Sequence, residues 1–173
     1  MLKAKVLSLS AVLVFSGVLS FSQDAKPNWD AWKIVIGDWS GTGSGDPGHG
    51  SGEFSFKPEL QGSILIRKSH SEYPASQARP AVVHDDLMVV YSEDGRTRAI
   101  YFDSEGHVIS YTPSFSQEGK TLTLVSDPAP NSPTFRLTYV STEPNALSIN
   151  FEIAPPGTST FKSYVGGLVH RVK

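Results

Sequence analysis

The sequence predicts an all-β protein: a single antiparallel up-and-down β-barrel of about ten strands with a short N-terminal helix. Two observations carry this prediction. Apolar residues recur at every second position through most of the chain, and turn-forming residues separate these segments at short, regular intervals. Such short links join antiparallel neighbours, because a parallel crossover needs a dozen or more residues. A meander of this length loses its exposed edges when it closes into a barrel.

Residues 1–22 are predicted to be a secretory signal peptide and not part of the fold. Two lysines precede an apolar run over 6–21, and small residues offer a cleavage site after Ser22. This run of about sixteen residues is shorter than the roughly twenty that a transmembrane helix needs. We therefore expect a secreted or periplasmic mature chain without a transmembrane anchor, folded as one barrel domain over 23–173.

Composition excludes several classes of function. Lys and Arg total 15 against 17 Asp and Glu, a formal charge of −2, which becomes −4 once the two leader lysines are removed. A mildly acidic chain offers no basic surface for a nucleic-acid partner. The chain has no cysteine, which excludes disulfides, thiolate metal sites and cysteine nucleophiles. Packing and strand pairing must hold the fold.

The predicted helix comes first in the mature chain. Pro27 can start it, and it runs to about Ile36, where Gly37 ends it. Trp29, Trp32 and Ile36 fall on one face of this segment. We interpret it as a plug that covers one opening of the barrel.

The strands follow in order, each identified by its alternating apolar members. The expected strands cover approximately 39–43, 53–56, 65–73, 87–91, 100–102, 109–115, 122–124, 135–139, 147–153 and 161–171. Turn residues separate the later strands at 93–95, 103–106, 117–119, 127–130, 143–145 and 155–157.

The glycine-rich stretch 41–52 formally contains G-x-G-x-x-G at Gly43, Gly45 and Gly48. A dinucleotide site would require a helix to begin at the third glycine, so that its N-terminus meets the pyrophosphate. Here a turn and a strand-like segment follow instead. We interpret the stretch as a hairpin whose glycines permit sharp coiling or the close approach of another backbone.

A resemblance begins at Gly37-x-Trp39. The short helix, this Gly-x-Trp at the first strand, the meander and the terminal cation Arg171 together resemble the lipocalin and wider calycin barrels. The same region, extended through Gly41, Gly43 and Gly45, is similar to the opening of nitrobindin-like haem-binding barrels, and the middle of the chain resembles secreted bacterial barrels of unassigned function.

The barrel prediction assigns a structural role to Trp39. Because the first and last strands of a closed barrel pair, we expect the guanidinium of Arg171 to lie against the Trp39 ring and close the barrel floor. A buried tryptophan removes about 150–250 Å² from water, so this closure should contribute strongly to stability.

The nitrobindin-like resemblance implies a proximal histidine on the last strand, some positions before the terminal basic residue. The matching place holds Lys162, Ser163 or Tyr164, and His170 lies too close to the end. Tyrosine can ligate haem iron, so Tyr164 keeps a haem alternative open, although filling the barrel wall is its simpler role. No cofactor is predicted.

Polar residues on the strands are the candidates for binding a ligand in the interior. They are Arg67, Tyr111, Arg136, Tyr139 and Tyr164. The sequence leaves open which strand faces point inward. His84 and Asp86 share one strand face, but two ligands are too few for a metal ion without distant partners, and no metal site is predicted. No G-x-S-x-G elbow occurs, and no catalytic residue is proposed.

These observations favour a secreted small-molecule-binding protein of lipocalin-like type over an enzyme. A hydrophobic or amphipathic ligand is the expected partner. Two alternatives stay open: a haem-binding or enzymatic barrel of nitrobindin-like type, and a barrel filled by its own side chains with a structural or interaction role. An apolar cavity with a few convergent polar groups would distinguish a small-molecule-binding barrel from a barrel filled by its own side chains.

Overall fold

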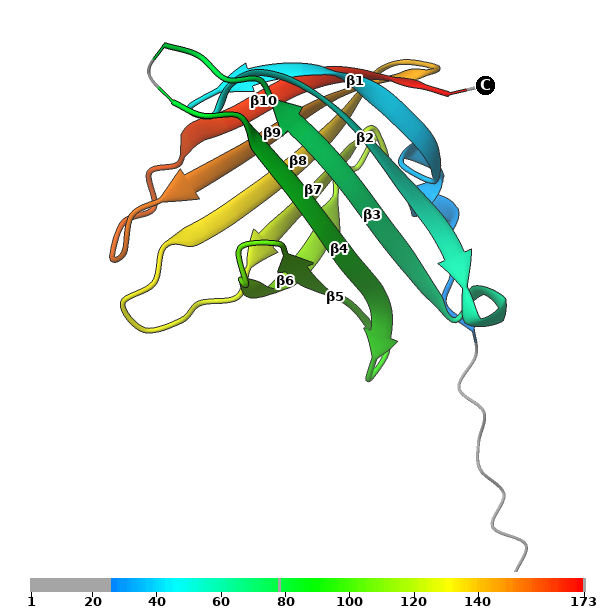
Figure 1. Cartoon of the computed structure of the whole chain (residues 1–173). Coiled ribbons are helices and arrows are strands. Elements are labelled where there is room, and N and C mark those ends of the chain that lie inside the picture. The colour runs from blue at the N-terminus through cyan, green and yellow to red at the C-terminus, as the bar shows by residue number, and fades with distance from the viewer. Residues whose placement is uncertain (1–25, 78, 173) are drawn as a thin grey trace, which may run out of the picture.

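The computed structural model describes residues 26–77 and 79–172, so the predicted signal peptide and its cleavage site lie outside the described residues. Within the described part, ten antiparallel strands form a closed barrel in which every strand pairs with its sequence neighbour and β1 pairs with β10 (Figure 1). The predicted all-β up-and-down barrel is confirmed. The strands are β1 (Gly37–Gly45), β2 (Gly48–Glu59), β3 (Ile64–Tyr73), β4 (Val82–Glu93), β5 (Arg96–Asp103), β6 (Val108–Phe115), β7 (Thr121–Ser126), β8 (Thr134–Glu143), β9 (Ala146–Ala154) and β10 (Lys162–Arg171).

The helical segments are shorter than the sequence suggests. The segment predicted over 27–36 forms one 3-10 helix, η1 (Asp30–Ile34), and a second, η2 (Leu60–Gly62), follows β2. Gly37 has a positive φ of 130°, which ends η1 and starts β1 sharply. In residues 26–77 and 79–172, no helix has the length and apolar character needed to cross a bilayer.

The up-and-down topology gives the barrel two different ends. Both 3-10 helices and the turn between β4 and β5 lie at one end, which we call the closed end. The turns β1–β2 and β5–β6 and the longer links β3–β4, β7–β8 and β9–β10 lie at the other, the open end. Figure 1 shows the long links together on the side away from η1.

Aromatic side chains fill the closed end. The ring of Trp32, which is 2 % exposed, lies 5.4 Å from that of Phe115 and 6.1 Å from that of Phe56. Edge-to-face and tilted contacts at such distances add to the free energy of burial. The predicted plug segment therefore covers this end of the barrel, with Trp32 as its buried residue and Trp29 and Ile36 partly buried against the core.

Trp39 and Arg171 lie beside the plug, where the first and last strands meet. They are direct partners in the β1–β10 register, and the Arg171 guanidinium carbon lies 4.3 Å from the centre of the Trp39 ring. The Trp39 indole N–H donates a hydrogen bond of 2.8 Å to the carbonyl of Val35, just after η1. One buried residue thus ties together the plug, β1 and β10.

The glycine-rich stretch forms the β1–β2 hairpin, as predicted. A Cβ added at Gly41 would lie 2.1 Å from the carbonyl oxygen of Leu168, and one at Gly45 would lie 2.1 Å from that of Tyr164. Both oxygens belong to β10, so these glycines allow β10 to approach β1 closely. The predicted strand over 53–56 is longer than expected, because β2 begins at Gly48 within this stretch.

Candidate functional site

The open half of the barrel holds a cavity of about 510 Å³. Its volume falls within the range of small-molecule sites, roughly 300–1,000 Å³. Glycines of β1, β2 and β10 form part of its wall. These cavity-lining glycines are Gly41, Gly43, Gly50, Gly52, Gly166 and Gly167.

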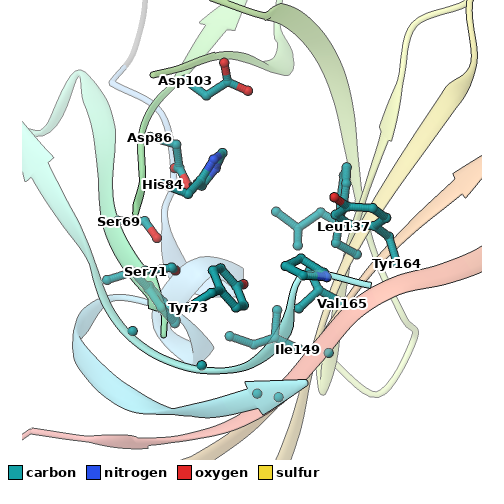
Figure 2. Close-up of a pocket in the computed structure, with 18 of the residues that line it drawn as sticks. Ser69, Ser71, Tyr73, His84, Asp86, Asp103, Leu137, Ile149, Tyr164 and Val165 are labelled. Atoms are coloured by element: carbon teal, nitrogen blue, oxygen red, sulfur yellow. Dashed lines mark ion pairs between the residues drawn. The ribbon is translucent and has the colours of Figure 1, made fainter. Parts of the chain in front are cut away.

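The cavity has two chemically different walls. In Figure 2, polar side chains from β3, β4 and β5 lie on one side, and apolar side chains from β8, β9 and β10 lie on the other. The polar wall includes Ser69, Ser71, His84, Asp86, Tyr101 and Asp103. The apolar wall includes Phe135, Leu137, Ile149, Phe151, Val165 and Val169. An elongated molecule with one polar edge matches this division.

A buried ion pair lies at the base of the polar wall. Arg67 on β3 and Asp86 on β4 are in contact, and their side chains are only 9 % and 5 % exposed. Burial opposes the charge of Arg67, but the adjacent Asp86 carboxylate raises the pKa of the guanidinium above its usual range. The Arg67 guanidinium also lies over the Phe54 ring, 5.3 Å from its centre. The cation is thereby held between the cavity and the aromatic core.

Two buried polar atoms at this depth lack hydrogen-bond partners among the described residues. They are Nε of Arg67 and the hydroxyl of Tyr139. Burial raises the pKa of Tyr139 to about 12, and the nearby Arg67 charge limits that rise. A buried polar group without a hydrogen-bond partner costs free energy.

His84 is the centre of a chain of polar contacts nearer the mouth. Its Nδ1 lies 2.8 Å from a carboxylate oxygen of Glu105, and its Nε2 lies 3.0 Å from the hydroxyl of Tyr101. The Asp86 carboxylate lies 3.6 Å from the same Nε2. Asp86 first, and then Glu105, raise the pKa of His84 to about 9, against partial burial. His84 is therefore an imidazolium at neutral pH.

A third carboxylate completes this group. Asp103, at the end of β5, accepts backbone hydrogen bonds from Glu105 and His107 at 3.1 and 2.8 Å and pairs with the His107 ring at 2.8 Å. Burial opposes its charge, but these hydrogen bonds lower the pKa of Asp103. The carboxylate is ionised at neutral pH.

These side chains also form the one group of described residues with the spacing of a metal site. His84, Asp103 and Glu105 each offer a ligand atom, and the three atoms lie within 4.8 Å of one another. A metal ion would have to displace the proton that His84 shares with Glu105, because only the neutral imidazole ligates.

The predicted ligand-binding residues separate into four groups. Arg67 and Tyr111 line the cavity, whereas Tyr139 lies fully buried beneath it. Tyr164 is at the mouth, 37 % exposed, with its ring against Phe151. Arg136 does not line the cavity: it alternates with the inward Phe135 and Leu137.

Arg136 lies on the outer surface of β8 instead. Its guanidinium makes two hydrogen bonds to Glu152, of 2.6 and 2.8 Å, and lies 4.0 Å from the centre of the Phe161 ring. These contacts provide the Arg136 guanidinium with hydrogen-bond and charge partners outside the barrel. The pKa of Arg136 is raised first by its hydrogen bonds to Glu152.

Sequence reasoning identified His84 and Asp86 but missed Tyr101, Asp103 and Glu105. The sequence did contain a signal for Tyr101 and Asp103. The tight turn at Asp94-Gly95 fixes the β4–β5 register, in which Met88 pairs with Tyr101 and Asp86 with Asp103. Paired residues lie on the same face of a sheet, so Tyr101 and Asp103 had to face the interior wherever Asp86 does.

The three β10 positions considered for a proximal haem ligand hold no histidine. Of the three β10 positions considered for an axial ligand, Tyr164 is the one that lines the cavity, while Lys162 and Ser163 are exposed. His170 is exposed at the closed end. His84 does face the cavity, but Glu105 and Tyr101 engage both of its ring nitrogens.

Comparisons with known proteins support the fold. No family model matches the chain, and no curated protein does. The crystal structure of Rv2717c from M. tuberculosis superposes with a TM-score of 0.59 at 15 % identity, covering 87 % of this chain and 100 % of the other. At this identity the likeness shows the fold alone, a closed antiparallel β-barrel.

Two further structures show weaker similarity. An S-type phycobiliprotein lyase from Guillardia theta gives a TM-score of 0.46 at 11 % identity, covering 82 % of this chain and 90 % of the other. A de novo designed fluorescence-activating barrel gives 0.42 at 11 % identity, covering 83 % and 98 %. At these scores neither structure contributes to the argument that follows.

Proposed function

We propose that this protein is a secreted small-molecule-binding protein of lipocalin-like type, which takes an amphipathic ligand through the open end of its barrel. The observation that carries the proposal is the cavity of about 510 Å³ with one polar and one apolar wall. Such a cavity buries the body of a ligand against apolar side chains while a few polar groups fix its orientation.

A barrel filled by its own side chains, the alternative raised from the sequence, describes only half of this molecule. The aromatic contacts of Trp32, Phe56 and Phe115 close one end, whereas glycines and serines line much of the other. The haem alternative would depend on Tyr164, because the β10 positions that match the proximal ligand hold no histidine.

A cavity-filling substitution tests the proposed function. Ile149 lies on the apolar wall opposite the cavity-lining Ser71, and its neighbour Ser148 points outward from the same strand. Ile149→Trp should reduce the affinity for 2-ethylnaphthalene, a neutral apolar probe measured by equilibrium dialysis, at least tenfold. Ser148→Trp should leave it unchanged. Equal binding by the two variants, or no binding by the unmodified protein, would contradict the proposal.

Two measurements extend this test to the natural ligand and the compartment. Native mass spectrometry of protein purified from its own host should show a retained mass that the Ile149→Trp variant lacks. N-terminal sequencing of the exported chain should begin at Gln23, as expected for cleavage after Ser22. A chain that begins at Met1 would contradict secretion by this route.

A further inference from the structure

Three aromatic rings follow one another across the apolar wall of the cavity. They belong to Phe135 on β8, Phe151 on β9 and Tyr164 on β10, and all three residues line the cavity. The rings of Phe135 and Phe151 are nearly parallel, at 14°, with their centres 5.9 Å apart. The ring of Tyr164 stands at 90° to that of Phe151, at 6.1 Å. Aromatic rings favour such offset-stacked and edge-to-face arrangements. We call these three residues the ring series.

The ring series lies near the mouth, and aliphatic side chains lie deeper on the same strands. Phe135 is close to the start of β8 and Phe151 close to the end of β9, and both of these strand ends are at the open end of the barrel. Leu137, Ile149 and Val169 line the cavity closer to the closed end. The apolar wall therefore changes from aliphatic side chains in the depth to aromatic rings at the entrance.

A β-bulge directs Tyr164 into this series. The β9–β10 register shifts between Ser163 and Val165. In a regular strand consecutive side chains point to opposite faces, yet Tyr164 and Val165 both lie at the cavity in Figure 2. The Tyr164 carbonyl accepts a hydrogen bond of 2.8 Å from the backbone N–H of Asp46, in the β1–β2 turn, which anchors the bulged residue. Bulges re-aim side chains beside functional sites, and this one supplies the third ring.

The ring series retains surface for a further ring. The aromatic residues at the centre of the closed end are buried, whereas Phe135 and Phe151 are only partly buried and Tyr164 is 37 % exposed. Tyr73 of β3 also lines the cavity, and in Figure 2 it lies on the side opposite Tyr164. An aromatic ring that enters the mouth would meet the ring series on one side and Tyr73 on the other.

On this basis we propose that the apolar body of the ligand contains an aromatic ring, which packs against Phe151 and Tyr164 near the mouth of the barrel. This inference rests on the proposed function and specifies the ligand class. One contact between aromatic rings adds about fivefold in affinity beyond the burial of its area. A saturated ring system with the same carbon skeleton buries a similar apolar area but makes no such contact.

Two probes with one carbon skeleton separate ring contacts from the burial of apolar area. Equilibrium dialysis would compare 2-ethylnaphthalene with 2-ethyldecahydronaphthalene, its fully saturated counterpart. Burial alone favours the saturated probe or leaves the two affinities equal, because the driving force follows the apolar area removed from water. With ring contacts, 2-ethylnaphthalene should bind about fivefold more tightly than the saturated probe.

Variants locate the preference in the ring series. Phe151→Leu removes the middle ring and should weaken 2-ethylnaphthalene binding about fivefold. Binding of the saturated probe should be retained, which also reports that the barrel is folded. Phe102→Leu makes the same change on β5 at a side chain that is 39 % exposed and does not line the cavity, and it should leave both affinities unchanged. Tyr164→Leu, at the exposed mouth, should reduce the preference and decides the question if Phe151→Leu does not fold.

The outcomes distinguish this inference from the proposed function. If neither probe binds, the proposed function is wrong. If the saturated probe binds as tightly as 2-ethylnaphthalene or more tightly, the cavity binds small molecules but the aromatic assignment is wrong. A preference that disappears in Phe151→Leu because the saturated probe gains affinity would be steric in origin and would equally overturn the inference. So would a preference that survives in the folded Phe151→Leu and Tyr164→Leu variants.

Discussion

At the closed end of the barrel the inward positions of β1 and β2 carry Trp39, Phe54 and Phe56, whereas toward the open end the same strands carry glycine at alternate positions. The backbone is the same antiparallel ladder throughout, with unbroken register between β1 and β2. The change from large side chains to glycine therefore accompanies the change from a packed core to a cavity. A barrel of this size can be stabilised at one end and left free to bind at the other.

The buried and exposed ion pairs differ in the same way. Arg67 and Asp86 lie inside with little exposed surface, and both belong to the cavity wall. Arg136 and Glu152 pair on the outside, where the arginine side chain is 34 % exposed. Breaking a buried pair leaves an unsolvated charge, whereas water replaces a lost partner at the surface.

Removing the closure at Trp39 should have the largest effect on stability. Trp39→Ala should lower the free energy of unfolding by about 3–5 kcal/mol, because it creates a cavity and removes the ring beneath Arg171. Urea denaturation measures this change. Leu168→Ala, which alters an outer side chain that is 47 % exposed, is the control and should change stability by about 0.5 kcal/mol or less. Similar values for the two variants would contradict the assignment.

Breaking the interior ion pair should have the second-largest effect on stability. Asp86→Asn leaves the Arg67 cation buried without its counter-charge and should lower the free energy of unfolding by about 3 kcal/mol. Thermal and urea denaturation at neutral pH would measure the loss. A variant as stable as the unmodified protein would show that Arg67 is solvated through the cavity.

The pH dependence of stability should come next in size. The pKa of His84 is raised to about 9 in the folded protein from 6.5. Its contribution is therefore fully present below pH 6.5 and is lost as the pH rises through about 9. Partial exposure limits this contribution to about 2 kcal/mol. Denaturation between pH 6 and about 10 should show the decline, and His84→Gln should flatten it. An identical slope in the variant would assign the dependence to another group.

The exterior ion pair should give the smallest effect. Glu152→Gln removes the charged partner of Arg136, which remains partly solvated and packed against Phe161. The expected loss is about 1 kcal/mol or less, and it should shrink at high salt. A loss equal to that of Asp86→Asn would mean that inside and outside pairs do not differ in this barrel.

Local patterns in the sequence were sufficient for the architecture. Alternating apolar residues and short turns specify antiparallel strands, and a meander without protected edges closes on itself. The pairing of Trp39 with Arg171 follows from that closure, because the first and last strands must meet. These properties depend on neighbours in sequence or on the order of the strands.

The inner and outer faces and the hollow interior were decided only by the tertiary structure. Arg67 and Arg136 occupy equivalent places in alternating segments, yet one lies inside and the other outside. The curvature of the closed sheet selects the face of each strand, and it brings Glu105 from a turn onto His84 of another strand. Period-two alternation is compatible with either face of a strand pointing inward. The residues of the site could therefore be identified only from the three-dimensional fold.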